Sequence, residues 1–361
     1  MVKCRTTDSQ CSSLTQSTYE NLLLTRGHII TDKSMVEGLK LGLINSLKTR
    51  GLKGTIKQGV LKSLGLEQQK EEIDSLYYFL NSYCDISALP PTKNENLRNL
   101  QLGILELLRI FDKLCKKHNL TYFLDAGNLL GAYRHKGFIP WDDDMDVAMP
   151  REDYDKVVPL LKEELNKYGI IVGPGGIYDD RGILQRIGIN YKTAETGIWM
   201  DIFPIDTIQS KYELSQIRPL LDRVVSKYGD FYKKNEKKLT PTELTKEKAL
   251  FFSKYEELCN GDNAICLLCP EFNKKAYCVS YNDIYPLKEI EFEGYLFPSP
   301  KTPPQYIKEY YGENFMSFPR TGIEHHLDFD GSTASTRAVR HNIDMKKEIE
   351  YLKNVFEKVQ M

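Results

Sequence analysis

The sequence has no long apolar run, no excess of either charge and few cysteines, and each of these absences excludes a class of protein. No window reaches the roughly 18 uninterrupted apolar residues of a transmembrane helix, and no apolar stretch follows the N-terminal residues as in a secretory leader. These two absences predict a cytoplasmic protein. The 49 basic and 50 acidic residues leave a net charge of −1, whereas a dedicated nucleic-acid-binding protein usually carries a basic excess. We therefore expect no nucleic-acid partner.

Eight cysteines in 361 residues are too few for a disulfide scaffold, so in a reducing compartment we expect thiols or metal ligands. Four of them lie in one short stretch: Cys259, Cys266, Cys269 and Cys278. Four thiolates can close a tetrahedral structural Zn²⁺ site. However, the stretch contains a single CxxC pair, and the residues inside that pair are apolar. Structural zinc and four buried free thiols are both left open.

A basic segment at residues 33–66 carries apolar residues at helical spacing. These residues are Val36, Leu39, Leu43 and Leu47, then Leu52, Ile56, Val60 and Leu64. The pattern indicates two amphipathic helices. From Asp32 to Leu66 the chain has seven basic and two acidic residues. A basic amphipathic segment can make a peripheral contact with an anionic membrane, here its inner, cytoplasmic face. The alternative, which we favour, is two helices packed on the main domain with a solvated lysine face.

A proline-containing break at 88–92 ends this N-terminal helical extension, which we assign to residues 1–96. Apolar residues at helical spacing then predict a helix over 97–117 and another over 151–165. We expect strands at 120–125, 144–149, 170–172, 183–191 and 198–203, and a final helix at 345–359. This order is that of an α/β (α+β) domain. We assign the domain to 97–330 and expect 331–361 to pack on it as a C-terminal helix.

The segment from Trp141 to Asp146 contains four aspartates, at positions 142, 143, 144 and 146. In a strand, side chains alternate between faces, so Asp144 and Asp146 point the same way while Met145 points into a core. Two carboxylates about 7 Å apart on one face repel each other unless a cation lies between them. Mg²⁺, or Mn²⁺, is the natural candidate, because it takes carboxylates together with phosphate oxygens. The alternative is a solvated acidic turn after a proline.

Asp201 is a candidate third carboxylate. It interrupts an apolar run that reads as a buried strand. A carboxylate there costs on the order of several kcal/mol unless it is paired or metal-bound. We predict that Asp201 is a metal ligand or the base for an acceptor hydroxyl, the alternative being an ion pair with a nearby basic side chain.

Residues 124–151, LDAGNLLGAYRHKGFIPWDDDMDVAMPR, closely resemble the signature of the LicD family of phosphocholine transferases and their fukutin-group relatives. Residues 197–206 are similar to the second motif of that family. Residues 291–300, together with Tyr310-Tyr311-Gly312, are similar to its C-terminal motif. The resemblance covers about residues 97–330 and leaves 1–96 outside it.

The resemblance implies a nucleotidyltransferase-like fold, a small mixed sheet flanked by helices, with Asp144, Asp146 and Asp201 as catalytic and metal-binding acids. It also implies a CDP-activated donor, release of CMP, and a hydroxyl acceptor on a glycan or glycolipid. One departure concerns Asn128, which stands where the family usually has Thr or Ser. We expect Gly127 and Asn128 to contact donor phosphate, because Asn can still donate a hydrogen bond.

Further candidates for donor or acceptor binding share a basic or aromatic character. They are Arg134, His135, Lys136, Trp141, Arg186, Arg320, His325 and His326. Basic side chains beside a metal–carboxylate site suit a polyphosphate. Trp141 can stack on a base or face a cationic alcohol, and its alternative is core packing. For Arg186, Arg320 and the histidines the alternative is an ion pair or a surface turn.

Two other functions use the same three acids. A nucleotidyltransferase that makes the activated donor would release pyrophosphate, whereas the transferase would release CMP. A non-catalytic nucleotide-binding module would keep the fold without turnover, which the presence of all three acids disfavours. The group transferred and its acceptor are not determined by the sequence.

Overall fold

The computed structural model describes residues 66–174, 187–235, 238–239, 247, 261–268, 277–320 and 334–359. The chain divides into two compact units, Met1–Ala88 and Leu89–Met361. In the first unit the described elements are α4 (Leu66–Tyr83) and the 3-10 turn η2 (Ile86–Ala88). The two helices predicted at residues 33–66 lie outside the described residues, apart from Leu66. None of the helices described is both long and apolar enough to cross a membrane.

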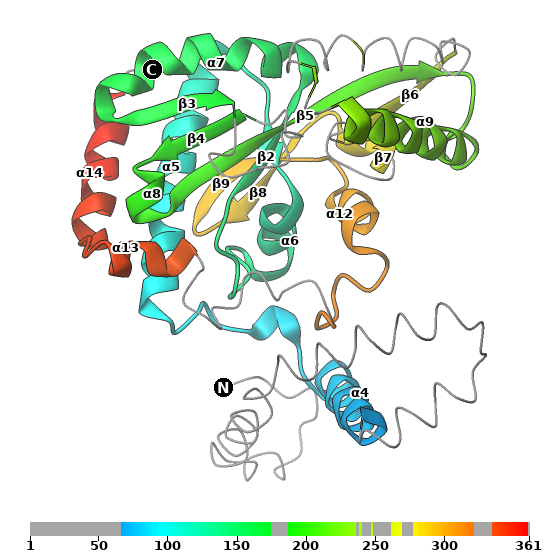
Figure 1. Cartoon of the computed structure of the whole chain (residues 1–361), viewed down its shortest axis with the longest axis horizontal. Coiled ribbons are helices and arrows are strands. Elements are labelled where there is room, and N and C mark those ends of the chain that lie inside the picture. The colour runs from blue at the N-terminus through cyan, green and yellow to red at the C-terminus, as the bar shows by residue number, and fades with distance from the viewer. Residues whose placement is uncertain are drawn as a thin grey trace. The chain divides into compact units, whose positions relative to one another are not determined.

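The second unit is built on a mixed sheet, which confirms the predicted α+β class (Figure 1). Its strands run in the order β1 (Phe123–Leu124), β2 (Asp146–Pro150), β5 (Ile198–Ser210), β4 (Ile187–Tyr191) and β3 (Ile170–Pro174). The long strand β5 continues past β2 and pairs there with β6 (Asn263–Leu268), which in turn pairs with β7 (Tyr277–Ser280). β2 and β5 are parallel, and the other pairs are antiparallel.

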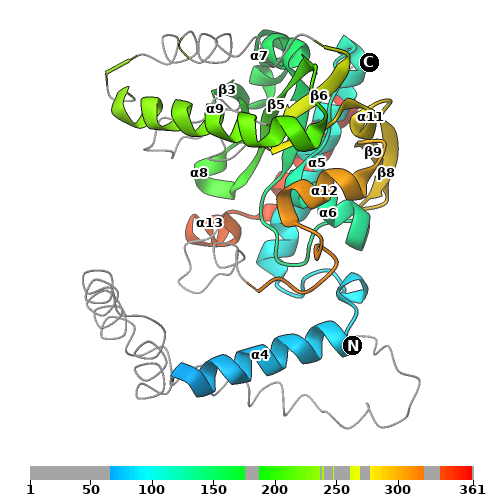
Figure 2. The same ribbon diagram turned by 90° about the vertical axis from the view of Figure 1, so that its right-hand side faces the viewer.

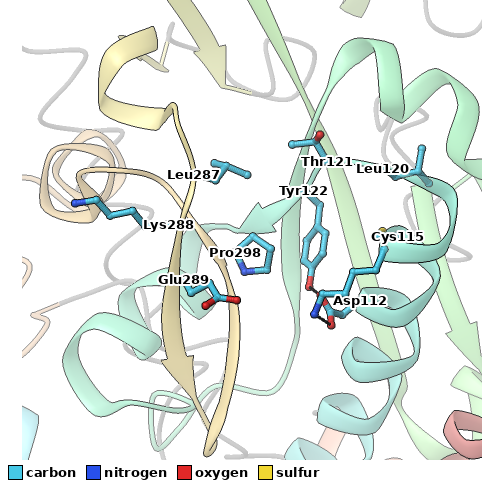
Figure 3. Close-up of a pocket in the computed structure, with 10 residues that line it drawn as sticks. Asp112, Cys115, Leu120, Thr121, Tyr122, Leu287, Lys288, Glu289 and Pro298 are labelled. Carbon is cyan, nitrogen blue, oxygen red and sulfur yellow. Dashed lines mark hydrogen bonds and ion pairs between the residues drawn. The ribbon is translucent and has the colours of Figure 1, made fainter. Parts of the chain in front are cut away.

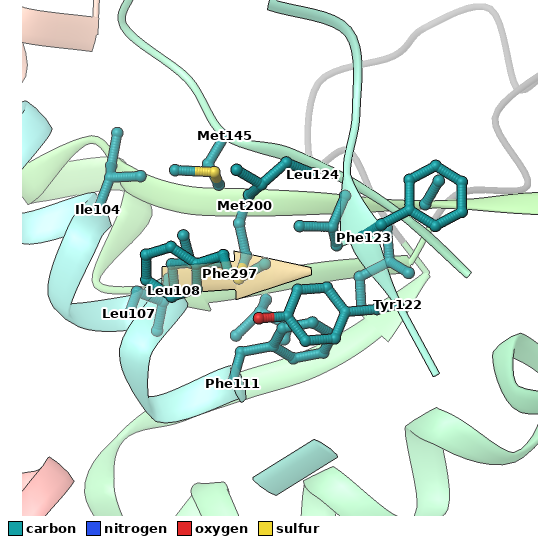
Figure 4. Packing of buried hydrophobic residues seen from close by; sticks show 14 of the residues in the cluster. Ile104, Leu107, Leu108, Phe111, Tyr122, Phe123, Leu124, Met145, Met200 and Phe297 are labelled. Carbon is teal, nitrogen blue, oxygen red and sulfur yellow. The ribbon is translucent and has the colours of Figure 1, made fainter. Parts of the chain in front are cut away.

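Helix α5 (Glu95–His118) forms the main support of the sheet and matches the helix predicted at 97–117. Asn94 caps its first turn by accepting hydrogen bonds from two backbone N–H groups, and Asn119 ends it in the left-handed conformation. Figure 4 shows its apolar face, with Leu108 and Phe111, packed toward Met200 and other core side chains. Helix α14 (Met345–Lys358) lies along α5, where Lys113 Nζ donates to the Phe356 carbonyl at 2.8 Å.

The remaining elements surround the sheet. They are α6 (Ala126–His135), α7 (Arg151–Leu165), η3 (Asn166–Tyr168), α8 (Thr193–Thr196), α9 (Leu214–Asn235), α11 (Tyr281–Ile284), the hairpin of β8 (Lys288–Phe292) and β9 (Tyr295–Ser299), α12 (Pro303–Tyr311), η5 (Ala334–Thr336) and α13 (Arg337–Arg340). Helix α9 lies over β6 and β7, where Ile217 and Leu221 pack on Ile265 and Leu267 (Figure 2). Helix α7 occupies the predicted range 151–165.

Two predicted strands are shorter than expected, for a common reason. β1 covers two residues rather than 120–125, because Asp125 already serves as the N-cap of α6. Because β1 has ended there, strand β2, which pairs with it, begins at Asp146 rather than at Asp144. Asp144 and Met145 therefore precede the strand, and strand alternation alone does not set the direction of the Asp144 side chain.

The β8–β9 hairpin is fixed to α5 by one glutamate in its turn. Glu293 pairs with Arg98 through two hydrogen bonds of 2.6 and 3.0 Å, and it also accepts from the backbone N–H of Phe138 at 3.1 Å. The segment that leads from α6 to the aspartates is thereby tied to both α5 and the hairpin. A Cβ at Gly137 would lie 2.5 Å from a Glu293 carboxylate oxygen, so any larger residue there would displace the Glu293 side chain.

Candidate active site

The parallel pairing of β2 with β5 brings two of the predicted acids together. The register sets Asp146 directly beside Asp201, on strands about 4.8 Å apart. Side chains at paired positions of neighbouring strands point to the same face. Met200 packs toward α5 (Figure 4), so Asp201 points to the other face of the sheet. Asp201 is buried, and its backbone N–H donates to the Met145 carbonyl at 2.8 Å.

Asp146 lies in the field of four further carboxylates. Burial is the largest reason that the pKa of Asp146 lies well above its ordinary value, and the charges of Asp144, Asp201, Asp125 and Asp142 raise it further. We call these five aspartates the acidic cluster. Negative charge held this closely favours a bound cation, which would relieve the repulsion.

The first turn of α6 lies against the acidic cluster. Asp125 Oδ1 accepts from the Ala126 N–H at 2.7 Å and from the Tyr306 hydroxyl of α12 at 2.7 Å. Burial raises the pKa of Asp125 to about 6, against the opposing effect of these two donors. A Cβ at Gly127 would lie 2.9 Å from Asp142 Oδ2, so glycine leaves the space that this carboxylate occupies. Gly127 thus lies beside Asp142, and its predicted contact with donor phosphate stays a prediction.

Asn128 is placed differently from the prediction. Its side chain is fully buried, its Nδ2 donates to the Asp144 carbonyl at 3.2 Å, and its Oδ1 accepts from the Asp146 N–H at 2.5 Å. Because the side chain is fully buried, a phosphate in solvent cannot reach the Asn128 amide, although one of its two N–H groups is not used by the Asp144 carbonyl. The expected phosphate contact is corrected to a contact with the acidic segment itself.

The predicted basic cluster lies at the C-terminal end of α6, roughly 13 Å along the helix axis from Gly127. Arg134 is buried and donates to the Phe315 carbonyl at 2.7 Å and to His135 Nε2 at 2.9 Å. Burial lowers the pKa of Arg134 to about 10, and the nearby charge of Asp142 is among those that oppose this shift. Arg134 is thus within electrostatic reach of the acidic cluster.

Lys136 lies beside the β8–β9 hairpin. It ends α6 in the left-handed conformation, and its Nζ lies 3.3 Å from a carboxylate oxygen of Glu291 on β8. The predicted role of Lys136 in stabilising donor phosphate stays a prediction, because this ion pair is well exposed.

The other predicted binding residues divide into described and undescribed positions. Trp141 is half-buried and packs on the core, which is the alternative to base stacking given for it above. Arg320 lies at an exposed position after α12. Arg186, His325 and His326 lie outside the described residues, so their predicted roles stay predictions.

The four-cysteine zinc site does not agree with the two cysteines that are described. Cys266 and Leu268 of β6 face the main core, whereas Cys278 of β7 and Leu267 face α9. Since Leu267 pairs with Cys278 across the two strands, Cys266 and Cys278 point to opposite faces of the sheet. They cannot bind one ion together. Cys259 and Cys269 lie outside the described residues.

The acidic cluster fits a metal held by few protein ligands. Within the described residues, no three His, Cys, Asp or Glu side chains are arranged as a ready set of metal ligands. Mg²⁺ does not require such a set, because it commonly binds through one or two carboxylates and completes its shell with waters and substrate phosphates. Asp144 and Asp146, with Asp201 beside them, are the residues that fit this mode.

Tyr311, at the end of α12, was not predicted as a site residue. Burial of its hydroxyl, followed by the charges of Asp142 and Asp146, raises the pKa of Tyr311 well above its ordinary value. The residue as a whole is 44% exposed, and its hydroxyl lies within electrostatic reach of the acids. The C-terminal motif of the resemblance contains this tyrosine and was the available signal.

A cavity of about 330 Å³ lies elsewhere, between the end of α5 and the β8–β9 hairpin (Figure 3). Its walls include Cys115, Leu120, Tyr122, Leu287 and Pro298, and Tyr122 donates to Asp112 at 2.9 Å. None of the five aspartates of the acidic cluster lines it. The cavity is therefore separate from the candidate site.

Fold and site together define an α+β domain in which carboxylates from neighbouring parallel strands meet beside the first turn of a helix. Residues 119–216 match the family model described as LicD/FKTN/FKRP, nucleotidyltransferase domain. The matched residues contain the whole acidic cluster, and in this part the chain is similar to that family.

Three relatives align with parts of the chain. The lipopolysaccharide cholinephosphotransferase LicD of Haemophilus influenzae is 33% identical over 138 residues, which is 36% of this chain and 51% of that protein. An uncharacterized protein of Rickettsia typhi is 35% identical over 80 residues, 20% of this chain and 26% of the relative. One of Rickettsia prowazekii is 42% identical over 62 residues, 17% of this chain and 23% of the relative. The chain thus spans about half the length of the first and about a quarter of the other two.

Proposed function

We propose that this protein transfers a phospho-alcohol group, phosphocholine or a similar group, from a CDP-activated donor to a hydroxyl of a glycan or glycolipid. The observation that carries the proposal is the pairing of Asp146 with Asp201 within the acidic cluster, in the segment that matches the family model. The name of the Haemophilus relative, a lipopolysaccharide cholinephosphotransferase, supports phosphocholine as the first group to test and a lipopolysaccharide as the first acceptor.

In this proposal Asp144 and Asp146 hold Mg²⁺ or Mn²⁺, with Asp201 beside them as a third ligand or as the base. A bound divalent ion neutralises charge on the donor's diphosphate and orients its oxygens. Asn128 and the first turn of α6 hold the backbone that carries these acids. Asp146 as a whole residue is half-buried, whereas Asp201 is buried.

The transfer needs one bond to form and one to break. The acceptor hydroxyl oxygen attacks the phosphorus that carries the alcohol, and the bond from that phosphorus to the oxygen bridging to CMP breaks. Asp201 takes the hydroxyl proton, and CMP leaves with the bridging oxygen and its electron pair. Little covalent chemistry is required of the protein, so positioning and charge stabilisation supply most of the acceleration.

A second function is favoured by the family description, which names a nucleotidyltransferase domain. In that case the same acids would join CTP to a phospho-alcohol, and the released product would be pyrophosphate rather than CMP. The two functions share the site and differ in which phosphorus is attacked.

The discriminating experiment is mass spectrometry of the purified protein with Mg²⁺ and a panel of CDP-alcohols, including CDP-choline and CDP-ribitol, with lipopolysaccharide and other glycans as acceptors. We expect CMP and a phospho-alcohol adduct of the acceptor, both lost in Asp144→Asn and Asp146→Asn. Pyrophosphate released from CTP and phosphocholine would favour the second function. Nucleotide binding without any product across the panel would favour a non-catalytic module, and full turnover in both variants would exclude the proposed site.

A further inference from the structure

Asn128 lies where two structural elements change at once. β1 ends at Leu124, and the chain turns into α6 after Asp125. On the side that β1 would occupy, the backbone at Asp144 and Met145 therefore has no strand beside it. The last backbone hydrogen bond of this pair runs from the Asp125 N–H to the Asp146 carbonyl at 3.0 Å. Beyond it the backbone of the acidic segment needs other partners.

The carboxamide of Asn128 supplies those partners. It accepts from the Asp146 N–H at 2.5 Å and donates to the Asp144 carbonyl at 3.2 Å, as a peptide group of a neighbouring strand would do. The Met145 carbonyl, between them, accepts from the Asp201 N–H of β5 at 2.8 Å. The backbone from Asp144 to Asp146 is thus held from both sides.

This geometry requires both ends of an amide. The hydroxyl of a serine or threonine offers its donor and its acceptor on one atom close to the backbone, and an aspartate offers acceptors only. Full burial of Asn128 also removes competition from water for both hydrogen bonds. The Asn128 side chain therefore holds the backbone of Asp144 and Asp146.

We infer that Asn128 is a positioning residue: its carboxamide replaces a missing strand neighbour and sets the spacing of the Asp144 and Asp146 carboxylates for a divalent cation. The inference rests on the proposed function in so far as it assigns a metal to these acids. Hydrogen-bonding partners that orient metal ligands typically change metal affinity about 10- to 100-fold when they are removed.

The test measures Mn²⁺ affinity by electron paramagnetic resonance, with the metal alone, in the full chain and in Asn128→Ala and Asn128→Ser. We expect the Mn²⁺ dissociation constant to rise at least about tenfold in both variants. Hydrogen exchange of the Asp146 amide in the metal-free protein should accelerate by a similar factor, because its acceptor is weakened or lost. A role in general stability alone would lower the melting temperature without this selective change at Asp146.

Asn354→Ala is the matched control, because Asn354 Nδ2 also donates to a backbone carbonyl, that of Glu350 at 2.9 Å, but on α14. It should leave both readouts unchanged. Mn²⁺ affinity within twofold of wild type in a folded Asn128 variant would overturn the inference. If neither variant folds, the wild-type protein decides: slow exchange of the Asn128 side-chain amide protons supports the contact, and solvent-like exchange overturns it.

The outcome for the proposed function is separate. Weaker Mn²⁺ binding in the variants, with no CMP released by the wild-type protein from any donor, would overturn the transferase proposal and support the role of Asn128. Unchanged Mn²⁺ binding in the variants, with CMP release by the wild type, would overturn the role of Asn128 alone.

Discussion

At the scale of single residues, the dominant feature of the site is the electrostatic repulsion among its closely placed carboxylates. Asp146 is surrounded by the other acids of the cluster, and its pKa lies well above the ordinary range because of burial and their charges. The backbone hydrogen bonds around it, including those of Asn128, hold it there at a cost to stability. Removing its charge should therefore affect function and stability in opposite directions.

We predict that Asp146→Asn lowers turnover at least about 10²-fold, since a group that stabilises reaction charge is lost. In the presence of a chelator its melting temperature should equal or exceed that of wild type, because the repulsion from Asp144 and Asp201 is relieved. Steady-state kinetics and thermal denaturation measure the two effects. A clearly lower melting temperature would show that the carboxylate is needed for the fold itself.

Tyr306→Phe tests the buried contact between α12 and the N-cap of α6. The substitution removes the hydroxyl that donates to Asp125 and leaves that carboxyl buried with one fewer partner. We expect the free energy of unfolding to fall by about 1–3 kcal/mol, measured by urea denaturation. Tyr133→Phe, on an exposed ring, is the control and should change it little. Equal stability of the two variants would contradict the role given to the Tyr306 hydroxyl.

At the scale of elements, the segment that carries the acids is held by its neighbours rather than by its own secondary structure. Residues 136–145 contain no helix or strand, yet several of their side chains are buried. Gln101 of α5 donates to the Asp142 carbonyl at 2.9 Å, and Glu293 of the hairpin accepts from Phe138. Close packing adds to this, because a Cβ at Gly131 would lie 2.5 Å from the Gly137 carbonyl.

Glu293→Gln should release this segment. We expect a loss of about 1–3 kcal/mol in the free energy of unfolding, because the charged pair with Arg98 is only partly exposed and makes two hydrogen bonds. Hydrogen exchange should also accelerate at residues 137–142. Glu291→Gln removes the well-exposed pair with Lys136 and should cost less than about 0.5 kcal/mol. The prediction fails if the two variants are equally stable.

At the scale of the whole molecule, the chain consists of two units, Met1–Ala88 and Leu89–Met361. The main hydrophobic core draws all its residues from the second unit, between Leu100 and Val359. The family match also lies wholly within it. The predicted domain boundaries at 96/97 and 330/331 stay predictions.

A protein that begins at Leu89 should fold by itself. We expect cooperative thermal unfolding and Mn²⁺ affinity equal to that of the full chain, because the described core residues of the main cluster and the five aspartates all lie within residues 89–361. Calorimetry and metal titration measure this. A non-cooperative transition would show that the first unit is needed for the second to fold.

Binding to vesicles tests the basic segment at residues 33–66. If this segment contacts an anionic membrane, the full chain should sediment with phosphatidylglycerol vesicles, with binding that weakens as salt increases. The protein that begins at Leu89 should remain in the supernatant. Equal binding of both proteins would assign any membrane contact to the second unit, and no binding by either would favour helices packed without lipid.

Much of the architecture was predictable because it is encoded locally. Apolar spacing and the caps at Asn94 and Asn119 determine α5 within a few residues, and α7 occupies the predicted range. Asp201 could be selected because a carboxylate within an apolar strand is costly without a partner, and Asp144 and Asp146 because they lie in a dense acidic run. These features depend on near neighbours in the chain.

Only the tertiary structure decided how distant segments meet. The end of β1 leaves Asn128 to serve the backbone of the acids, and the end of α6 directs Lys136 toward Glu291. Strand pairing places Cys266 and Cys278 on opposite faces, and α12 brings Tyr311 to the aspartates. None of these positions follows from local spacing, because each depends on which segments, far apart in sequence, pack together. The amino-acid sequence by itself determined which residues could carry the chemistry, and the packing decided which of them face one another.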